Sequence, residues 1–103
     1  MSKTIINGKA YNTETARFLG SHSDNLSRRD FRFYYEELYL KKTGEFFLSG
    51  EGGPMSAYAA YYDDGMRGSG TRILPLTEAE AREWVENNLD YEDYIEIFGE
   101  PEE

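Results

Sequence analysis

The sequence contains no cysteine, and this absence excludes two classes of small protein. Without cysteine, the chain has neither a disulfide framework nor a thiolate metal site. No stretch approaches the roughly 20 apolar residues of a membrane span, and residues 1–8 lack the apolar run of a signal peptide. We therefore expect a cytoplasmic protein with no membrane partner.

The sequence also lacks the residue patterns of known reaction centres. Its one histidine, His22, lies within residues 21–24 between serines and an aspartate. Four consecutive residues do not normally bring three side chains together for catalysis, and no nucleophile elbow surrounds them. The glycine-rich residues 50–54 lack the Gly-Lys-Ser/Thr ending of a phosphate-binding loop, and residues 63–65 lack the other ligand positions of a calcium loop. We expect no enzymatic activity, cofactor or metal.

Positive charge is scarce and unevenly placed. The net charge is −9, yet residues 1–42 carry eight Lys/Arg and five Asp/Glu, a net of +3. Residues 76–103 carry eleven acids against Arg82 alone, a net of −10. Nucleic-acid binding requires neutralisation of phosphates by Lys and Arg, so direct binding to nucleic acid is disfavoured. The distribution suits either solubility or a partner with a basic surface.

The length of 103 residues predicts one domain. We assign residues 1–99 to this domain and residues 100–103 to an acidic tail. Its centre is a predicted hairpin, residues 33–40 and 45–49, joined by a turn containing Gly44. Both strand faces are partly aromatic, which predicts a sheet covered by helices on one side and half-covered on the other. One face carries Tyr34, Glu36, Leu38 and Leu40, and the other Phe33, Tyr35, Glu37, Tyr39 and Lys41.

The remaining segments before residue 77 give weaker patterns. Asn7-Gly8 predicts a hairpin between residues 3–6 and 9–11, because both residues suit a type I′ turn. Residues 12–20 fit either a short helix or a strand, and residues 56–62 either a strand or a helical turn. Residues 71–74 are predicted as a third strand. Loops or turns are predicted at 21–32, 50–54 and 65–70, and the first contains the basic cluster Arg28, Arg29 and Arg32, expected to pair with the acidic half.

Two helices are predicted at the C-terminus. Thr77 and Glu80 form a capping box. The first apolar stripe comprises Ala81, Trp84, Val85 and Asn88, with Leu89 near its edge. Asp90 caps a second helix, which ends at Gly99. Its predicted stripe comprises Tyr91, Tyr94, Ile95 and Phe98.

Acidic residues on these helices form the candidate binding site, here called the acidic C-terminal face. Carboxylates three or four positions apart on a helix lie about 5–6 Å apart at Cβ, on the order of the charge spacing along a nucleic-acid strand. They could therefore present a phosphate-like row to a basic groove. The face comprises Glu78, Glu83, Glu86, Asp90, Glu92, Asp93 and Glu96.

Three segments of the second half carry a family resemblance. They are GEGGPMSAYA (50–59), LPLTEAEAREW (74–84) and YIEIFGE (94–100). They resemble small acidic proteins carried by bacterial mobile elements and phages, some of which are anti-CRISPR inhibitors that block the DNA-binding surface of a Cas effector. The resemblance implies a bacterial host cell and identifies no functional residues.

The sequence therefore predicts an α+β fold, with a small antiparallel sheet of three or more strands packed with C-terminal helices. The leading hypothesis is a monomeric, non-enzymatic, anti-CRISPR-like inhibitor. Its acidic C-terminal face would act as a DNA mimic and bind a basic protein surface, such as a Cas effector complex, without contacting nucleic acid. The alternative is an accessory or regulatory protein-binding module that uses an aromatic sheet face, including Tyr35 and Tyr39.

Overall fold

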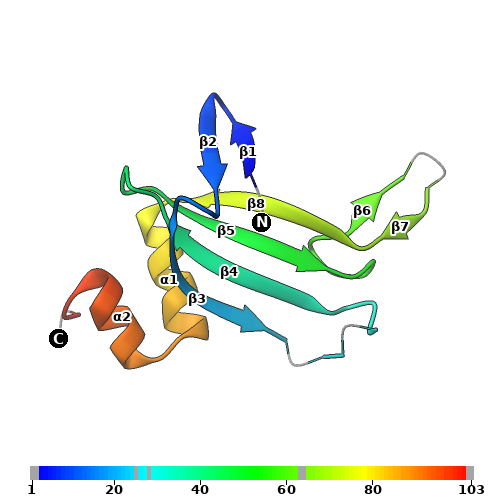
Figure 1. Ribbon diagram of the computed structural model, residues 1–103. Coiled ribbons are helices and arrows are strands. Elements are labelled where there is room, and N and C mark those ends of the chain that lie inside the picture. Colours follow the sequence, from blue (N-terminus) through cyan, green and yellow to red (C-terminus); the bar gives the residue numbers. More distant parts are fainter. Residues whose placement is uncertain (1–2, 25, 28, 63–64, 102–103) are drawn as a thin grey trace.

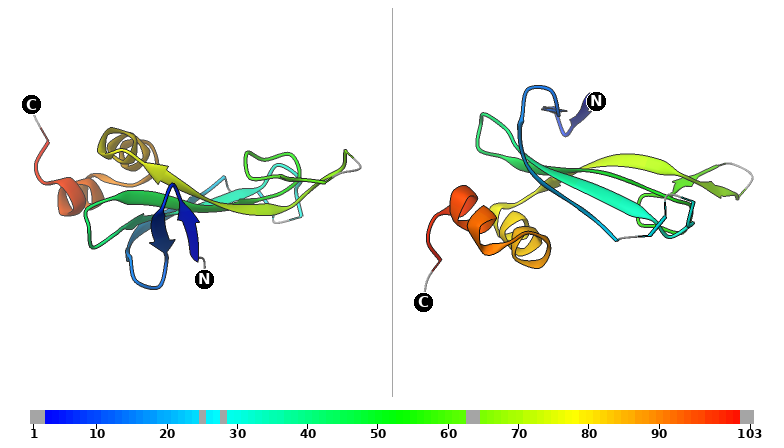
Figure 2. Two further views of the ribbon diagram at one scale, coloured as in Figure 1. Left: turned by 90° about the horizontal axis from the view of Figure 1, so that it is seen from above. Right: turned by 60° about the horizontal axis from the view of Figure 1, so that its bottom comes forward.

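A four-stranded antiparallel sheet with strand order β3-β4-β5-β8 forms the centre of the protein (Figure 1). The computed structural model describes residues 3–24, 26–27, 29–62 and 65–101. Two helices lie on one face of this sheet, and the N-terminal hairpin lies on the other (Figure 2). The predicted α+β class is confirmed. The elements are β1 (Lys3–Ile6), β2 (Lys9–Asn12), β3 (Arg17–Ser23), β4 (Tyr34–Leu40), β5 (Phe46–Gly52), β6 (Ala60–Tyr61), β7 (Arg67–Gly68), β8 (Gly70–Leu76), α1 (Glu78–Asn88) and α2 (Tyr91–Phe98).

The predicted central hairpin is formed by β4 and β5. Leu38 is paired with Leu48, and Tyr39 with Phe47, so apolar side chains meet on both faces. The predicted third strand is β8, which pairs with β5 along its whole length. Sheet strands alternate their side chains between faces, so each of these pairs adds to a separate core.

The two faces of the sheet bury two separate apolar clusters, as the alternation in β4 predicts. On the helix face, α1 packs its apolar stripe against β4 and β5; the buried members are Leu38, Phe46, Leu48, Ala81, Trp84 and Val85. On the opposite face, the N-terminal hairpin covers part of the sheet; the buried members are Tyr11, Tyr39, Phe47 and Ile73. The molecule is therefore three layers thick only at the end that carries the helices.

The N-terminal hairpin turns at Asn7-Gly8 as predicted. Asn7 has φ 52° and Gly8 φ 79°, and a type I′ turn needs positive φ at both positions. The side chain of Tyr11 on β2 packs edge-on against Phe47, with ring centroids 5.4 Å apart. This contact docks the hairpin on the sheet.

Glu45 adds a polar tether between the hairpin and the β4–β5 turn. Its Oε2 lies 2.8 Å from Lys9 Nζ, and its Oε1 lies 3.0 Å from Lys41 Nζ and accepts a hydrogen bond from Thr43. These partners, Lys9 first, lower the pKa of the Glu45 carboxyl to about 2. The tether therefore depends on an ionised Glu45.

Glu45 is expected to titrate at about pH 2, as followed by NMR of its side-chain carboxyl. A carboxyl whose pKa is lowered by folding stabilises the protein above its ordinary pKa, and this contribution is lost as the pH falls through the folded value. In Lys9→Ala, the pKa of Glu45 is expected to rise, since the partner with the largest effect is gone. An equal Glu45 pKa in both proteins would contradict the tether.

Residues 12–20, left open between helix and strand, contain a turn followed by β3. Asn12 closes the turn by accepting hydrogen bonds from Glu14 N and Ala16 N. A register shift between Phe18 and Gly20 places Leu19 against the helix-face cluster. A Cβ on Gly20 would lie 2.6 Å from Leu89 Cδ1, so a side chain there would force Leu89 to move.

Three loop predictions are wrong in part because backbone pairing extends the strands. Residues 21–23 belong to β3, where they pair with β4. Residues 50–52 belong to β5 rather than to a turn, because β4 and β8 continue alongside them. Within residues 65–70, Arg67 and Gly68 form β7, which pairs with β6, and Gly70 begins β8. Residues 56–62, also left open, contain a turn and then β6.

The C-terminal helices begin as predicted. Thr77 accepts a hydrogen bond from Glu80 N, while the Glu80 side chain accepts one from Thr77 N. The predicted stripe of α2 is wrong in part. Tyr94 and Phe98 pack against the helix-face cluster together with Ile97, whereas Tyr91 is 63% exposed. Helix α2 contacts both α1 and β3. The side of α2 that faces these elements therefore carries Tyr94 and Ile97.

Candidate functional site

The residues of the acidic C-terminal face belong to α1, α2 and the cap between them, and these helices lie at one end of the protein (Figure 1). Six of its seven carboxylate side chains belong to exposed residues, and Asp93 is half-buried. Glu78, Glu83 and Glu86 point away from the sheet as predicted. Their surroundings divide the seven residues into three groups.

Two of the seven acids are paired with arginines of the same chain. Arg82 Nη2 lies 2.8 Å from Glu78 Oε2, and Arg17 Nη2 on β3 lies 3.4 Å from Glu96 Oε1. Both pairs are exposed, so they contribute little to stability. They do reduce the negative charge that Glu78 and Glu96 present to a partner.

Two more acids form the N-terminus of α2. The side chain of Asp90 accepts a hydrogen bond from Asp93 N, 3.0 Å away, as expected of an N-cap. The pKa of the Asp93 carboxyl is raised, first by desolvation and then by the neighbouring Asp90. This end of α2 therefore concentrates negative charge, and its helix dipole partly offsets the repulsion.

The remaining three acids, Glu83, Glu86 and Glu92, make no hydrogen bond or ion pair with any residue that the structure describes. All three are exposed. Glu83 and Glu86 are three positions apart on α1, which makes them neighbours on its surface. The seven acids of the predicted face therefore comprise three carboxylates without partners among the described residues, two that are paired with arginines, and two at the N-terminus of α2.

A groove lies beside these carboxylates, where the end of α1 meets the start of α2. Its volume is about 280 Å³, and Val85, Leu89, Tyr94 and Pro101 supply apolar walls. Tyr91, Glu86 and Asp90 complete the lining, which contains no basic residue. The groove was not predicted, because it depends on the angle between two separate helices.

A polar cluster on the helix face was also missed by the sequence reasoning. Glu36 on β4 accepts a hydrogen bond from Trp84 Nε1, 3.0 Å away, and another from the hydroxyl of Tyr58. Desolvation, and then Glu36, raise the pKa of Tyr58. Trp84 is buried as predicted, but it also links α1 to the sheet. The available signal was a carboxylate on the same strand face as Leu38 and Leu40.

His22 lies near this cluster, on β3. Its Nε2 is 3.3 Å from the hydroxyl of Tyr34, and the two ring centroids are 5.9 Å apart. The histidine therefore contacts a tyrosine of the neighbouring strand rather than forming a triad within residues 21–24. Among the described residues, no group of three His, Asp or Glu side chains is arranged to hold a metal ion. Asp63 and Asp64 lie outside the described residues.

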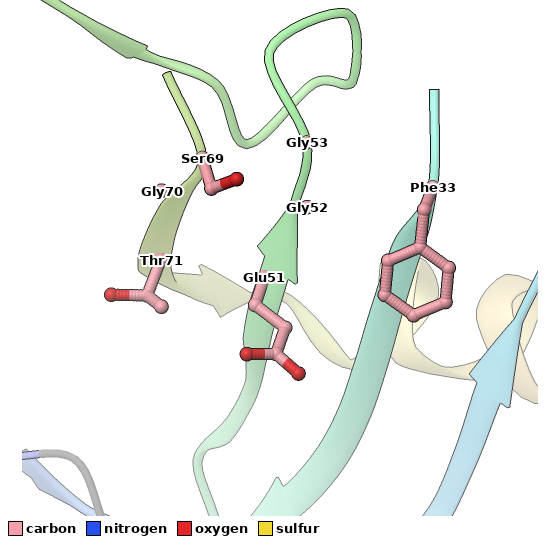
Figure 3. Close-up of a pocket in the computed structure, with 7 residues that line it drawn as sticks. All are labelled: Phe33, Glu51, Gly52, Gly53, Ser69, Gly70 and Thr71. Carbon is pink, nitrogen blue, oxygen red and sulfur yellow. The ribbon is translucent and has the colours of Figure 1, made fainter. Parts of the chain in front are cut away.

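A second pocket lies at the opposite end of the sheet (Figure 3). Its volume is about 300 Å³, and Phe33, Glu51 and Thr71 contribute side chains from three neighbouring segments. The backbone of Gly52, Gly53 and Gly70 completes it together with Ser69. Although glycine-rich, this pocket does not suit phosphate, because the Glu51 carboxylate lines it and would repel an anion.

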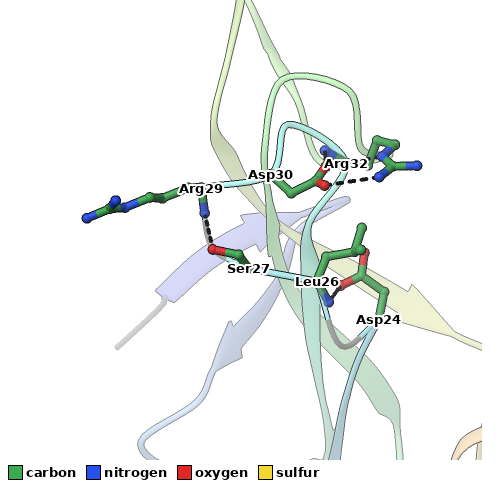
Figure 4. A network of polar contacts seen from close by, with 6 residues as sticks. All are labelled: Asp24, Leu26, Ser27, Arg29, Asp30 and Arg32. Atoms are coloured by element: carbon green, nitrogen blue, oxygen red, sulfur yellow. Dashed lines mark hydrogen bonds and ion pairs between the residues drawn. The ribbon is translucent and has the colours of Figure 1, made fainter.

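Within the described part of the predicted basic cluster, Arg32 does not pair with the acidic half. Arg32 instead binds Asp30 of the same loop, with Nη2 and Nε at 3.0 and 3.1 Å from its carboxylate oxygens (Figure 4). The backbone N–H of Arg29 donates to Ser27 Oγ, and its side chain extends away from the loop. Arg28 lies outside the described residues. A pair within the loop fixes fewer residues than a pair with the distant helices, so its cost in conformational entropy is lower.

The aromatic sheet face offers less surface than its sequence suggests. Tyr39 is buried and stacks on Phe47 with ring centroids 5.3 Å apart, because the N-terminal hairpin covers it. Tyr35 is half-buried and donates a hydrogen bond to Glu37. A Tyr39→Ala substitution would therefore disturb the core rather than report on a partner.

Comparisons of the chain with protein-family models, curated proteins and solved structures found no match. The resemblance to anti-CRISPR proteins consequently stays a prediction. No helix within the described residues is long and apolar enough to cross a membrane. Glu102 and Glu103, the last residues of the predicted acidic tail, lie outside the described residues.

Proposed function

We propose that this protein is a non-enzymatic inhibitor, similar to anti-CRISPR proteins, that occupies a basic DNA-binding surface of a Cas effector complex. The acidic C-terminal face acts as the DNA mimic. Its carboxylates take the places of phosphates on the partner's Lys and Arg side chains, and target DNA is thereby excluded. The partner is a protein, and the inhibitor itself makes no contact with nucleic acid.

The observation that carries this proposal is the group Glu83, Glu86 and Glu92. These exposed carboxylates have no partner among the described residues, so binding a cation of the target breaks no internal ion pair. They project from two capped helices, so the backbone that positions these side chains is regular helix rather than loop. The remainder of residues 76–103 adds to the negative field that steers a basic surface toward them.

Reversing these three charges tests the proposal. The combined Glu83→Lys, Glu86→Lys and Glu92→Lys variant is expected to lose inhibition of target-DNA binding by a purified Cas effector, by at least about tenfold in effective concentration. The substituted side chains are exposed, so thermal unfolding and circular dichroism are expected to stay close to those of the wild type.

A matched pair of single variants controls for net charge. Glu83→Lys and Glu14→Lys make the same change, but Glu14 is an exposed residue of the β2–β3 turn and belongs to neither helix. Only Glu83→Lys is expected to weaken inhibition. Equal inhibition by the triple variant and the wild type would overturn the acidic mimic, and so would equal losses in the two single variants.

A further inference from the structure

The groove between α1 and α2 has a size and lining that fit one amino-acid side chain. At about 280 Å³ it lies at or below the lower limit of ordinary small-molecule pockets, which span about 300–1,000 Å³. Its surface is mainly apolar, and Leu89 and Tyr94 line it above the buried Val85. A long side chain with an apolar stem would bury that stem here.

The rim of the groove selects the charge of the occupant. Glu86 and Asp90 both line it, and no basic residue does. Asp90 uses one oxygen to cap α2, whereas Glu86 has no partner among the described residues. An anionic side chain would be repelled, and a cationic one would meet a carboxylate at the end of its stem.

Tyr91 favours a guanidinium over an ammonium group. It lines the groove although 63% of it is exposed to solvent, so one ring surface is available to an occupant. A guanidinium is planar, stacks on aromatic rings and binds a carboxylate through two N–H groups, which an ammonium cannot reproduce.

The protein already holds one of its own arginines by this chemistry. The guanidinium of Arg82 donates to Glu78 and to the hydroxyl of Tyr94, and lies 4.6 Å from the centroid of the Phe98 ring. The groove also offers a carboxylate, Glu86, and an aromatic ring, Tyr91, but without an arginine among its lining residues. We infer that this groove receives an arginine side chain of the partner protein and anchors it beside the acidic C-terminal face.

This inference rests on the proposed function, because it names the partner side chain that the same face binds. It adds a specific contact to an interaction that charge alone would leave loosely oriented. Charge reversal tests the face as a whole, whereas the anchor is tested with an arginine peptide and with substitutions in the groove, of which Tyr91→Ala preserves the negative charge.

In the first test, a capped tripeptide, acetyl-Ala-Arg-Ala-amide, is titrated into the full-length protein, and binding is followed by NMR of the protein's backbone amides. Saturable shifts are expected at the amides of Leu89 and Tyr91. The same peptide with citrulline, which keeps the shape of arginine without its charge, is expected to leave these signals unmoved. Equal binding of the citrulline peptide, or no saturable shift with the arginine peptide, would overturn the inference.

Two substitutions locate the contact. Tyr91→Ala and Glu86→Gln are each expected to weaken binding of the arginine peptide by at least about threefold, through loss of ring stacking and of the carboxylate. Tyr61→Ala and Glu14→Gln are matched controls on other elements, with Tyr61 73% exposed, and are expected to bind like the wild type. Unchanged affinity in both groove variants would contradict the anchor.

Failure of the anchor and failure of the proposed function give different results. Tyr91→Ala retains every carboxylate. If this variant inhibits fully while the triple charge-reversal variant does not inhibit, the anchor is overturned and the DNA-mimic proposal stands. If the arginine peptide binds as expected but the triple charge-reversal variant inhibits normally, the groove stands and the DNA-mimic proposal falls.

Discussion

Replacing Phe47 with alanine is expected to lower the free energy of unfolding by about 3–5 kcal/mol, the range for a buried aromatic residue cut back to Ala. Phe47 is fully buried between Tyr11 and Tyr39. Its removal opens a cavity under the N-terminal hairpin and also eliminates two ring contacts. Urea denaturation, followed by circular dichroism, measures the loss.

Phe18→Ala is the matched control for this prediction. Phe18 also touches Tyr39, with ring centroids 5.7 Å apart, but 52% of its surface is exposed. Its loss is expected to cost about 1 kcal/mol or less. If Phe47→Ala does not fold, the smaller change Phe47→Leu is expected to show an intermediate loss. Equal stabilities for the Phe47 variants and Phe18→Ala would contradict the packing of the hairpin on the sheet.

Removing the Glu36 carboxylate is expected to cost about 2–6 kcal/mol, because two donors lose their acceptor and each buried donor left without a partner costs about 1–3 kcal/mol. In Glu36→Ala, the indole N–H of Trp84 and the hydroxyl of Tyr58 both lose their acceptor. Trp84 is the one tryptophan of the chain, so its fluorescence reports both the local change and the unfolding transition.

Glu36→Gln separates hydrogen bonding from the shape of the side chain. The amide oxygen retains an acceptor for one of the two donors, so the loss is expected to be smaller than in Glu36→Ala. A Glu36→Ala protein as stable as the wild type would show that the contacts of Trp84 and Tyr58 with this carboxylate contribute nothing to the fold.

The parts of the fold that depend on neighbouring residues were predictable from the sequence. Asn7-Gly8 indicates its turn through local backbone preferences, and Thr77 with Glu80 indicates the start of α1 through hydrogen bonds three residues apart. The alternation in β4 also indicates which side chains enter each core. These features need no knowledge of where distant segments lie.

The features that depend on distant pairing were missed. Strand β3 carries polar residues at 21–23, and only its backbone pairing with β4 makes it a strand. Glu36 and Trp84 are 48 positions apart, and Arg17 and Glu96 are 79 apart. Within the candidate site, the sequence located the acids, and the i,i+4 spacing of Glu78 and Arg82 was a sign of one pair, but nothing local indicated that Glu96 would pair with Arg17.

The measurement that tests the central claim most directly is the dissociation constant of the wild-type protein for purified Cas effector complexes, with and without bound target DNA. The acidic C-terminal face is expected to bind a DNA-free effector, with affinity that falls as salt screens the charges, and not to bind the DNA-loaded one. Binding of protein and DNA to the same effector at once, or no binding to any effector, would contradict the account.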